Sequence, residues 1–382
     1  MSDPPPRNFD LPHIEDDLLW KILVKAEPKV AARCQLLSTA WNFKLQSSLF
    51  LMENFHANRN RTRSLIIGMG HPPTDNVSHY FVRYDVDRNE QLTIVVPISI
   101  WRYQNHSVVG SDHGVICIRS SAGGGRSRIF LWNPLTSKDQ LLPDDPHGHC
   151  SFSTSVYGFG YLVDSKEHKI VHIFKCDHTD KNFRWSLYDS FGKGWNNKGV
   201  INSAIEKLDP KSVVLNGCVH WLGWVGVLQL EPSHIGIFDM QKMKWFEAEI
   251  PEGVKKTYHT LVAYNNGVGF VSYQNCGLRR NIHIWQLVQQ GGVGINWVKM
   301  INVGTLAIPL SPTVFIDNDI ISVLECRGGF AAANDANTID LLITILKRNA
   351  ISVRQLLHNS WQEELCLKTK TMHSESLYDP RT

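Results

Sequence analysis

Hydrophobic residues in the first sixty positions recur at the spacing of α-helices. Asp16 or Asp17 can cap the first free amides of a helix that starts there, and Pro28 ends it because proline cannot continue a helix interior. Ser38 opens a third pattern, SxxWxxxL. The hydrophobic residues of the three predicted helices are Leu18, Leu19, Ile22, Leu23 and Ala26, then Val30, Ala31, Cys34 and Leu37, then Trp41, Leu45 and Leu49.

Three helices in about forty residues bury only a small core. We expect them to leave apolar surface that a partner helix or an attached domain covers. The spacing alone leaves a second interpretation open, in which these helices form a cap on the domain that follows.

Beyond residue 60 the pattern changes to short alternating runs bounded by Gly, Asn, Asp and Pro, which is typical of β-strands. Hairpins with a tight polar turn recur about every fifty residues, around Gly114, Lys166, Gly217, Gly267 and Asp319. A second hairpin follows each of them by about twenty residues, as in IFLWNPLTSKDQLLP and IGIFDMQKMKWFEAEIP, and the copy YFVRYDVDRNEQLTIVV precedes the first complete unit.

Two hairpins in each unit make four strands, which is the content of one propeller blade at the period of kelch repeats. Five or six units can be counted along the chain, enough for a closed ring. The sequence therefore predicts an all-β, kelch-like β-propeller, with an irregular β-sandwich or two β domains as alternatives. Six tryptophans fall in these hairpins, as repeated core positions would: Trp132, Trp185, Trp221, Trp245, Trp285 and Trp297.

The N-terminal segment 11–55, LPHIEDDLLWKILVKAEPKVAARCQLLSTAWNFKLQSSLFLMENF, resembles the F-box. The matching positions are an acidic residue before Leu-Leu, an Ile-Leu, a Pro-Lys, an Arg, a Ser and a Trp. In this chain they are Asp17, Leu18, Leu19, Ile22, Leu23, Pro28, Lys29, Arg33, Ser38 and Trp41.

The strand-rich region resembles the F-box-associated domain of plant F-box proteins. Four landmarks carry this resemblance, in the family's order and spacing: LWNPLTSKDQLLP at 131–143, YGFGYLVDSKEHKIV at 157–171, VVLNGCVHWLGW at 213–224 and IGIFDMQKMKWFEAEIP at 235–251. The expected organisation is a small three-helix F-box followed by the propeller. Its boundaries are a disordered tail at 1–10, the F-box at 11–55, a linker at 56–64, the propeller at 65–367 and a flexible tail at 368–382.

Charge and composition narrow the classes of function. The 39 Lys and Arg nearly cancel the 36 Asp and Glu, so the chain lacks the basic surplus typical of nucleic-acid binders. No apolar run reaches the roughly 18 residues that a membrane helix needs, and the Pro-rich start has no signal-peptide core. We therefore expect no nucleic-acid or membrane partner and a cytoplasmic or nuclear location. The eight isolated cysteines are expected to be reduced.

Catalytic and metal-binding patterns are weak. The glycine-rich GGGRS at 123–127 lacks the order of a phosphate-binding loop, and the soft ligands in HGHC (147–150) and CDH (176–178) match no zinc spacing. No nucleophile elbow or HExxH motif is present. We expect no catalytic residue, cofactor or metal, and hence no enzyme.

The two resemblances together imply a specificity subunit of an SCF-type (Skp–cullin–F-box) ubiquitin ligase. The F-box would dock on a Skp-type adaptor, which links it to cullin and RING subunits, and the propeller would bind a target protein for ubiquitination and proteasomal degradation. The expected adaptor-binding residues are Leu18, Leu19, Ile22, Leu23, Leu37 and Trp41. The loops that would contact the target follow no repeat in the sequence, so no target-binding residue is predicted. The alternatives are an F-box lectin that reads glycans, a stand-alone propeller binding protein and a glycosidase-like enzyme.

Overall fold

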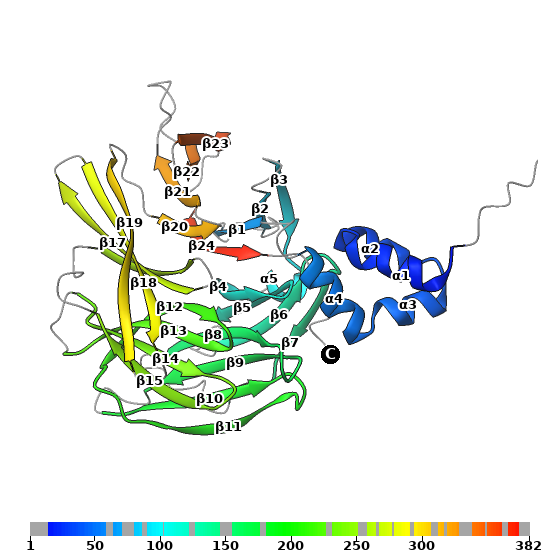
Figure 1. Cartoon of the computed structure of the whole chain (residues 1–382), viewed down its shortest axis with the longest axis horizontal. Helices are drawn as coiled ribbons and strands as arrows, with labels where there is room; N and C mark the ends of the chain where they lie inside the picture. Colours follow the sequence, from blue (N-terminus) through cyan, green and yellow to red (C-terminus); the bar gives the residue numbers. More distant parts are fainter. Residues whose placement is uncertain are drawn as a thin grey trace, which may run out of the picture.

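The computed structural model contains a helical unit and a strand-rich unit (Figure 1). It describes residues 14–58, 64–70, 80–85, 90–101, 103–121, 127–145, 155–175, 181–226, 231–250, 258–264, 267–276, 279–290, 294–306, 312–316, 319–327, 338–347, 350–360 and 366–373. The predicted tail at 1–10 and most of the predicted linker at 56–64 lie outside these residues. The same holds for HGHC (147–150), CDH (176–178) and all of GGGRS (123–127) except Ser127.

The helical unit has four helices where the sequence predicted three. Ser47 divides the third predicted helix, because its hydroxyl donates to the carbonyl of Lys44 and accepts from the amide of Phe50. It therefore closes one helix and caps the next. Glu15, without a side-chain bond, stands at the N-cap where Asp16 or Asp17 was expected, and both aspartates lie in the first turn. The helices are α1 (Asp16–Lys25), α2 (Pro28–Cys34), α3 (Thr39–Leu45) and α4 (Ser48–Asn58).

The four helices share one small core, which contains Leu23, Ala31, Leu45 and Phe50. Two buried asparagines of α4 tie it to the end of α1: the side-chain amide of Asn54 donates to the carbonyl of Ala26 at 2.9 Å, and Asn58 donates to the same oxygen at 2.9 Å. These bonds satisfy a carbonyl that the end of α1 leaves without a helical partner.

The strand-rich unit is built from six four-stranded antiparallel sheets within the described residues, which confirms an all-β, propeller-like fold. We number these blades along the chain. Blade 1 is β4 (Gln104–Asp112), β5 (Val115–Ser121), β6 (Ser127–Asn133) and β7 (Lys138–Leu141); blade 2 is β8 (Ser155–Leu162), β9 (Glu167–Phe174), β10 (Phe183–Asp189) and β11 (Gly194–Ile201); blade 3 is β12 (Lys207–Leu215), β13 (Cys218–Trp224), β14 (His234–Asp239) and β15 (Lys244–Glu249).

The remaining blades continue the same order. Blade 4 is β16 (Tyr258–Tyr264), β17 (Gly267–Cys276), β18 (Arg279–Gln290) and β19 (Gly294–Leu306); blade 5 is β20 (Pro312–Ile316), β21 (Asp319–Arg327), β22 (Thr338–Lys347) and β23 (Ala350–Ser360); blade 6 is β24 (Cys366–His373), β1 (Ser64–Gly70), β2 (Tyr80–Asp85) and β3 (Glu90–Val95). A short helix, α5 (Ile98–Trp101), leads from blade 6 into blade 1.

The C-terminal strand closes the ring. The first strand of each blade contacts the first strand of the next, from β4 through β8, β12, β16 and β20 to β24, and β24 contacts β4. Because β24 also pairs with β1, blade 6 joins strands from both ends of the chain, and Figure 1 shows β24 beside β1. This corrects the predicted flexible tail at 368–382, since its first residues, through His373, belong to a blade.

Outer hairpins of three blades repeat one turn. An Asn or Asp at the end of the third strand accepts two backbone amides of the turn through its side chain, and the residue four positions later has positive φ. The side chain mimics the backbone bond of a turn, which explains the Asn of the WNP landmark and the Asp of the FD landmark. The pairs are Asn133 with Ser137, Asp189 with Lys193, and Asp239 with Met243.

The two glycines of the YGFGY landmark let blades 2 and 3 approach each other. A Cβ on Gly158 would lie 2.3 Å from a methyl of Val219, and one on Gly160 would lie 2.6 Å from a methyl of Val214. The tryptophans also pack where repeated core positions were expected: Trp132 and Trp221 are fully buried, and Trp185, Trp245, Trp285 and Trp297 pack against cores while half-buried.

Candidate functional site

The helical unit presents an uncovered apolar stripe along α1. Leu18 and Ile22 are spaced four residues apart, so they fall on one side of the helix, and they are 54% and 49% exposed. Ile14, which precedes the N-cap Glu15, is 47% exposed and extends this stripe beyond the start of the helix. The opposite side of α1 carries Leu23 into the core of the unit. A row of large aliphatic side chains that stays exposed to solvent on a helix whose other side is packed is typical of a surface that binds another protein.

The structure divides the six predicted adaptor-binding residues into three groups. Leu18, Ile22 and Leu37 are exposed, and Leu37 lies in the turn after α2 rather than on a helix. Leu19 and Trp41 are half-buried against the core of the helical unit. Leu23 is 4% exposed, so it stabilises the fold and has no surface to offer a partner. Helical spacing could not separate these roles, because on a short helix hydrophobic residues that face the core and hydrophobic residues that face solvent recur at the same interval.

Several exposed hydrophobic residues of this unit were missed by the sequence reasoning. Leu36 and Phe43 are 87% and 82% exposed, more than any predicted residue. The third helix was assigned a face through Trp41 and Leu45, and Phe43 is not on that face. Phe43 could have been recognised as a large aromatic residue that does not share the helical spacing of Trp41 and Leu45. Ile14, Val30 and Leu49 are also exposed, although the adaptor-binding set did not include them and Val30 and Leu49 had been assigned only to helix faces.

Charged groups at the edge of this surface also join the helices. The ammonium of Lys44 on α3 lies 2.6 Å from a carboxylate oxygen of Asp16 on α1, and 4.8 Å from the centre of the Trp41 ring. Both charged groups are largely exposed, so this ion pair adds little to stability. It does fix the position of α3 beside the start of the apolar stripe.

A stack of three rings joins the helical unit to the propeller. Phe55 of α4 is 7% exposed and stacks on His113 with ring centroids 3.9 Å apart, and His113 stacks on Tyr161 at 4.1 Å. His113 lies in the turn between β4 and β5 at a φ of 47°, and Tyr161 lies on β8. The apolar stripe is therefore held on a lobe that packs directly against blades 1 and 2.

A partly buried carboxylate, that of Asp112, holds this junction in place. Asp112 lies 2.8 Å from Nδ1 of His113 and accepts the amide of Tyr161 at 2.8 Å. Burial alone would raise the pKa of Asp112, but the hydrogen bond and charge of His113, together with the Tyr161 amide, outweigh it and lower the pKa below its ordinary value. The residue thus stays ionised and keeps the His113 ring in the stack.

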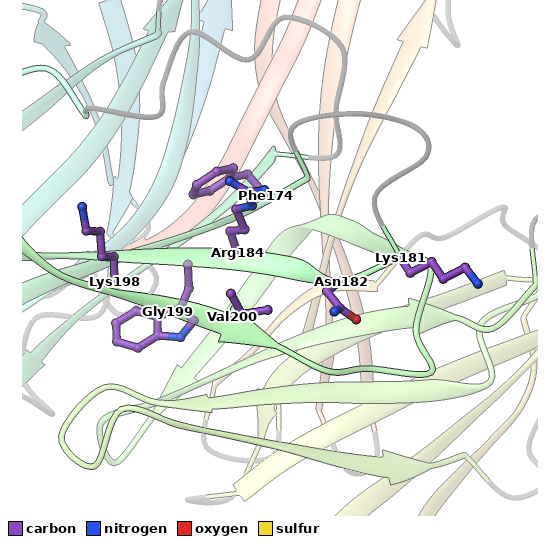
Figure 2. A pocket seen from close by; sticks show the side chains of 8 residues that line it. Phe174, Lys181, Asn182, Arg184, Lys198, Gly199 and Val200 are labelled. Carbon is purple, nitrogen blue, oxygen red and sulfur yellow. The ribbon is translucent and has the colours of Figure 1, made fainter.

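A cavity of about 520 Å³ lies on the outer strands of blade 2 (Figure 2). Its lining includes the basic residues Lys181, Arg184 and Lys198, and the rings of Phe174 and Trp185. No sequence pattern indicated this site, because its basic residues are separated in the chain and form no motif.

A Ser–His–Asp arrangement lies elsewhere in blade 2. The hydroxyl of Ser155 is 2.8 Å from Nε2 of His172, whose Nδ1 donates to Asp145, and Ser186 donates to the same carboxylate at 3.0 Å. His172 is 2% exposed and stacks on Tyr157 with ring centroids 4.2 Å apart. Because it links the end of blade 1 to three strands of blade 2, we interpret this network as a structural connection.

Two other kinds of site are absent from the described residues. No group of three or more His, Cys, Asp or Glu side chains there is arranged to hold a metal ion. None of the described helices has both the length and the hydrophobicity that crossing a bilayer requires.

Comparison with known proteins finds a matching family model and solved structures of low identity. The model of the F-box associated beta propeller domain matches residues 76–367. TolB from Acinetobacter baumannii is 11% identical with a TM-score of 0.49, and the match covers 86% of this chain and 72% of TolB. The β-propeller domain of the trilobed protease from Pyrococcus furiosus is 8% identical with a TM-score of 0.40, covering 78% and 81% of the two chains. No curated protein matches the sequence.

Proposed function

The chain belongs to the F-box associated beta propeller domain family, and from this membership and the exposed apolar face of its helices we propose that it is the target-recognition subunit of a Skp–cullin–F-box ubiquitin ligase. The helical unit acts as the F-box and docks on a Skp-type adaptor, which connects it to cullin and RING subunits. The propeller binds the target protein. The proposed location is the cytoplasm or nucleus, without a membrane or nucleic-acid partner.

The observation that carries this proposal is the stripe formed by Ile14, Leu18 and Ile22. Each of these side chains is about half exposed, so burying the rest against a partner would gain roughly half of the 1.5–3 kcal/mol that full burial of such a side chain contributes. Burial of all three together would support a stable complex. Leu36 and Leu37 add further exposed apolar surface on the same unit. Leu19 and Trp41 support this surface from beneath by packing on the core of the helices.

The proposed role is to supply proximity and orientation. A target held on the propeller is brought near the charged ubiquitin-conjugating enzyme, so that transfer to a target lysine behaves as an intramolecular step. The stack of Phe55 on His113 supports this role, since a packed junction limits the positions that the target can take relative to the adaptor. The chain itself makes and breaks no bond in this proposal, so it is not an enzyme.

The test is binding of the purified full chain to a purified Skp-type adaptor. We expect the unchanged chain to bind and the double variant Leu18→Asp/Ile22→Asp to bind at least tenfold more weakly, because two charges would have to be buried at the contact. The control is Val163→Asp, in the turn between β8 and β9, where the side chain is 49% exposed. Equal binding by the double variant, or no binding by the unchanged chain, would overturn the proposal.

Glycan recognition is the second candidate carried from the sequence, and no observation favours it. A lectin site would show tryptophan rings on one face. In the part of the chain that the structure describes, every tryptophan whose side chain is placed is buried or half-buried. A glycan array probed with the full chain would detect such a site.

A further inference from the structure

The free edge of blade 2 combines a row of cations that form no ion pair with a described residue and an open edge strand. We propose that this edge binds an extended acidic segment of a partner protein, which adds to the blade as a fifth strand alongside β11. The proposal rests on the proposed function in one respect only, that the partner is the target of the ligase.

The described lining of the cavity on this edge is positively charged. Its described lining contains Lys181, Arg184 and Lys198 and no acidic residue, and none of these three side chains makes an ion pair with a described residue. Arg184 pairs with Val200 across the two strands and Ser186 pairs with Lys198, so Arg184 and Lys198 are diagonal neighbours on one face of the sheet. Two like charges at that spacing repel each other, and an anion between them would remove the repulsion.

The spacing of the cations fits a chain better than a single anion. Figure 2 shows Lys198 and Lys181 at opposite ends of the lining, with Arg184 between them beside Phe174. A single phosphate group would need the three donors to converge on one point. Carboxylates carried at alternate positions of an extended peptide would instead meet them one after another, because side chains of a strand point to one face at every second residue.

The backbone at this site is available for pairing. The order of strands in blade 2 places β11 last, with β10 as its neighbour, and Figure 1 shows β11 at the rim of the molecule. In such an edge strand, alternate residues direct their N–H and C=O groups away from the sheet. Lys198 is exposed and Val200 is 64% exposed, so no described segment covers this edge. Peptide recognition by addition of a strand uses this geometry.

Trp185 supports the edge strand from the other face of the sheet. Trp185 on β10 and Gly199 on β11 form a cross-strand pair on the face opposite Arg184 and Lys198. A Cβ at Gly199 would lie 2.7 Å from the indole nitrogen, so the glycine leaves room for the indole beside the edge strand. The Trp185 ring also packs against the buried core, which holds β10 and β11 in position beneath the basic residues.

Lys198, the lysine of β11, has an alternative role, since a charged side chain on an edge strand discourages pairing with other strands. That role needs no ligand. The two roles are distinguished by measuring whether the full chain binds an acidic peptide. The probe is a fluorescein-labelled nine-residue peptide in which Glu alternates with Thr, and its binding is followed by fluorescence anisotropy. The matched peptide carries Gln in place of each Glu.

We expect the Glu peptide to bind and the Gln peptide to bind at least tenfold more weakly, with affinity falling as salt is added. The double variant Arg184→Glu/Lys198→Glu should lose at least tenfold, and the single variant Arg184→Gln, a mild change at an exposed side chain, should lose a smaller factor with an unchanged melting temperature. The control pair Lys211→Glu/Lys244→Glu makes the same change in net charge at exposed sites on blade 3 and should lose less than twofold.

Pairing as a strand is tested by replacing alternate peptide amides with N-methyl amides, which should weaken binding at least tenfold when the methylated face meets β11. Three results would overturn the proposal: equal binding of the Gln peptide, equal loss in the control pair, or tighter binding of a single-stranded oligonucleotide that the blade 2 variants abolish.

The two proposals fail separately. Adaptor binding is measured on the same Arg184→Glu/Lys198→Glu chain, and we expect it to match that of the unchanged chain because the substitutions lie on blade 2. Loss of peptide binding with adaptor binding retained assigns the edge to the partner segment. Peptide binding by a chain that fails to bind the adaptor would refute the ligase proposal and leave the acidic-segment site intact.

Discussion

The aromatic ring of Phe55 stacks on the imidazole of His113 with centroids 3.9 Å apart and an interplanar angle of 25°. One residue belongs to the last helix of the N-terminal unit and the other to the first turn of blade 1. Phe55 also packs in the cluster that contains Val115, Cys117 and Tyr157. The helical unit therefore shares a hydrophobic core with the propeller, and its orientation is a consequence of packing.

Replacing Phe55 with Ala should lower the free energy of unfolding by about 3–5 kcal/mol, because a buried ring is removed from a packed cluster. Chemical denaturation of the full chain measures this change, and limited proteolysis between the two units should become faster. Phe191→Ala is the control, since Phe191 is 87% exposed and should change stability by no more than about 0.5 kcal/mol. An unchanged denaturation midpoint for Phe55→Ala would show that the junction is not part of the folded core.

Stability should decrease as the pH is lowered from about 7 to about 4. Burial lowers the pKa of His168 and of His220 to about 4. Between that value and about 6.5 the unfolded chain binds protons that the folded chain does not, so each histidine costs about 1.4 kcal/mol of stability per pH unit. Urea denaturation at several pH values measures the slope. His220→Gln should reduce the slope by the contribution of one histidine, and an unchanged slope would contradict the assignment.

Asp145→Asn should destabilise the contact between blades 1 and 2. The carboxylate of Asp145 accepts from His172 and from Ser186, and both donors are buried. An amide cannot accept both bonds in the same way, so we expect a loss of about 1–3 kcal/mol, seen as a lower melting temperature. The matched control is Asp209→Asn on blade 3, which changes the same charge at a half-buried side chain that accepts the amide of Lys211 at 2.8 Å, a bond that an asparagine oxygen can also accept. A similar small effect of both substitutions would mean that the network is not structural.

Ser155, His172 and Asp145 follow the order of a catalytic triad, yet we expect no covalent reactivity. His172 is 2% exposed and is covered by the ring of Tyr157, so a substrate carbonyl has no route to the face of the imidazole. A fluorophosphonate reagent, which labels activated serines, should leave the full chain unmodified in a mass spectrum. Labelling that disappears in Ser155→Ala would instead establish a nucleophile.

Gly158→Ala should destabilise the contact between blades 2 and 3. The added Cβ would lie 2.3 Å from a methyl group of Val219, which is fully buried, so one of the two strands must move. Overpacking of this kind costs about 1–3 kcal/mol. Gly110→Ala is the comparison, because its Cβ would meet Phe159 at an ordinary distance of 3.5 Å. If the two substitutions cost the same in a thermal melt, the close approach is not what requires glycine at position 158.

Much of the propeller was predictable because each hairpin carries its own signal. The turn at Asn216 and Gly217, both at positive φ, is a local preference of those two residue types. The division of the third predicted helix by Ser47 was not predictable in the same way, since a serine caps a helix only when the chain bends there.

Some residues of the candidate site could likewise be predicted from local spacing, and others could not. The spacing of Leu18 and Ile22 placed them on one side of a helix, and the structure leaves both exposed. The spacing of Leu23 looked the same, but the residue is buried because α2, α3 and α4 pack on that side. Phe43 and the cations of blade 2 had no pattern at all, because they meet their neighbours only after the chain has folded.

The sequence by itself determined the alternation of strands, the four-stranded unit and the period of about fifty residues, since these follow from which face each side chain takes along a strand. The tertiary structure alone decided that β24 joins β1, a pairing between residues near opposite ends of the chain, and that blade 2 ends in an open basic edge. Such contacts depend on how completed blades meet around the ring. A local sequence pattern cannot indicate a neighbour that lies about three hundred residues away in the chain.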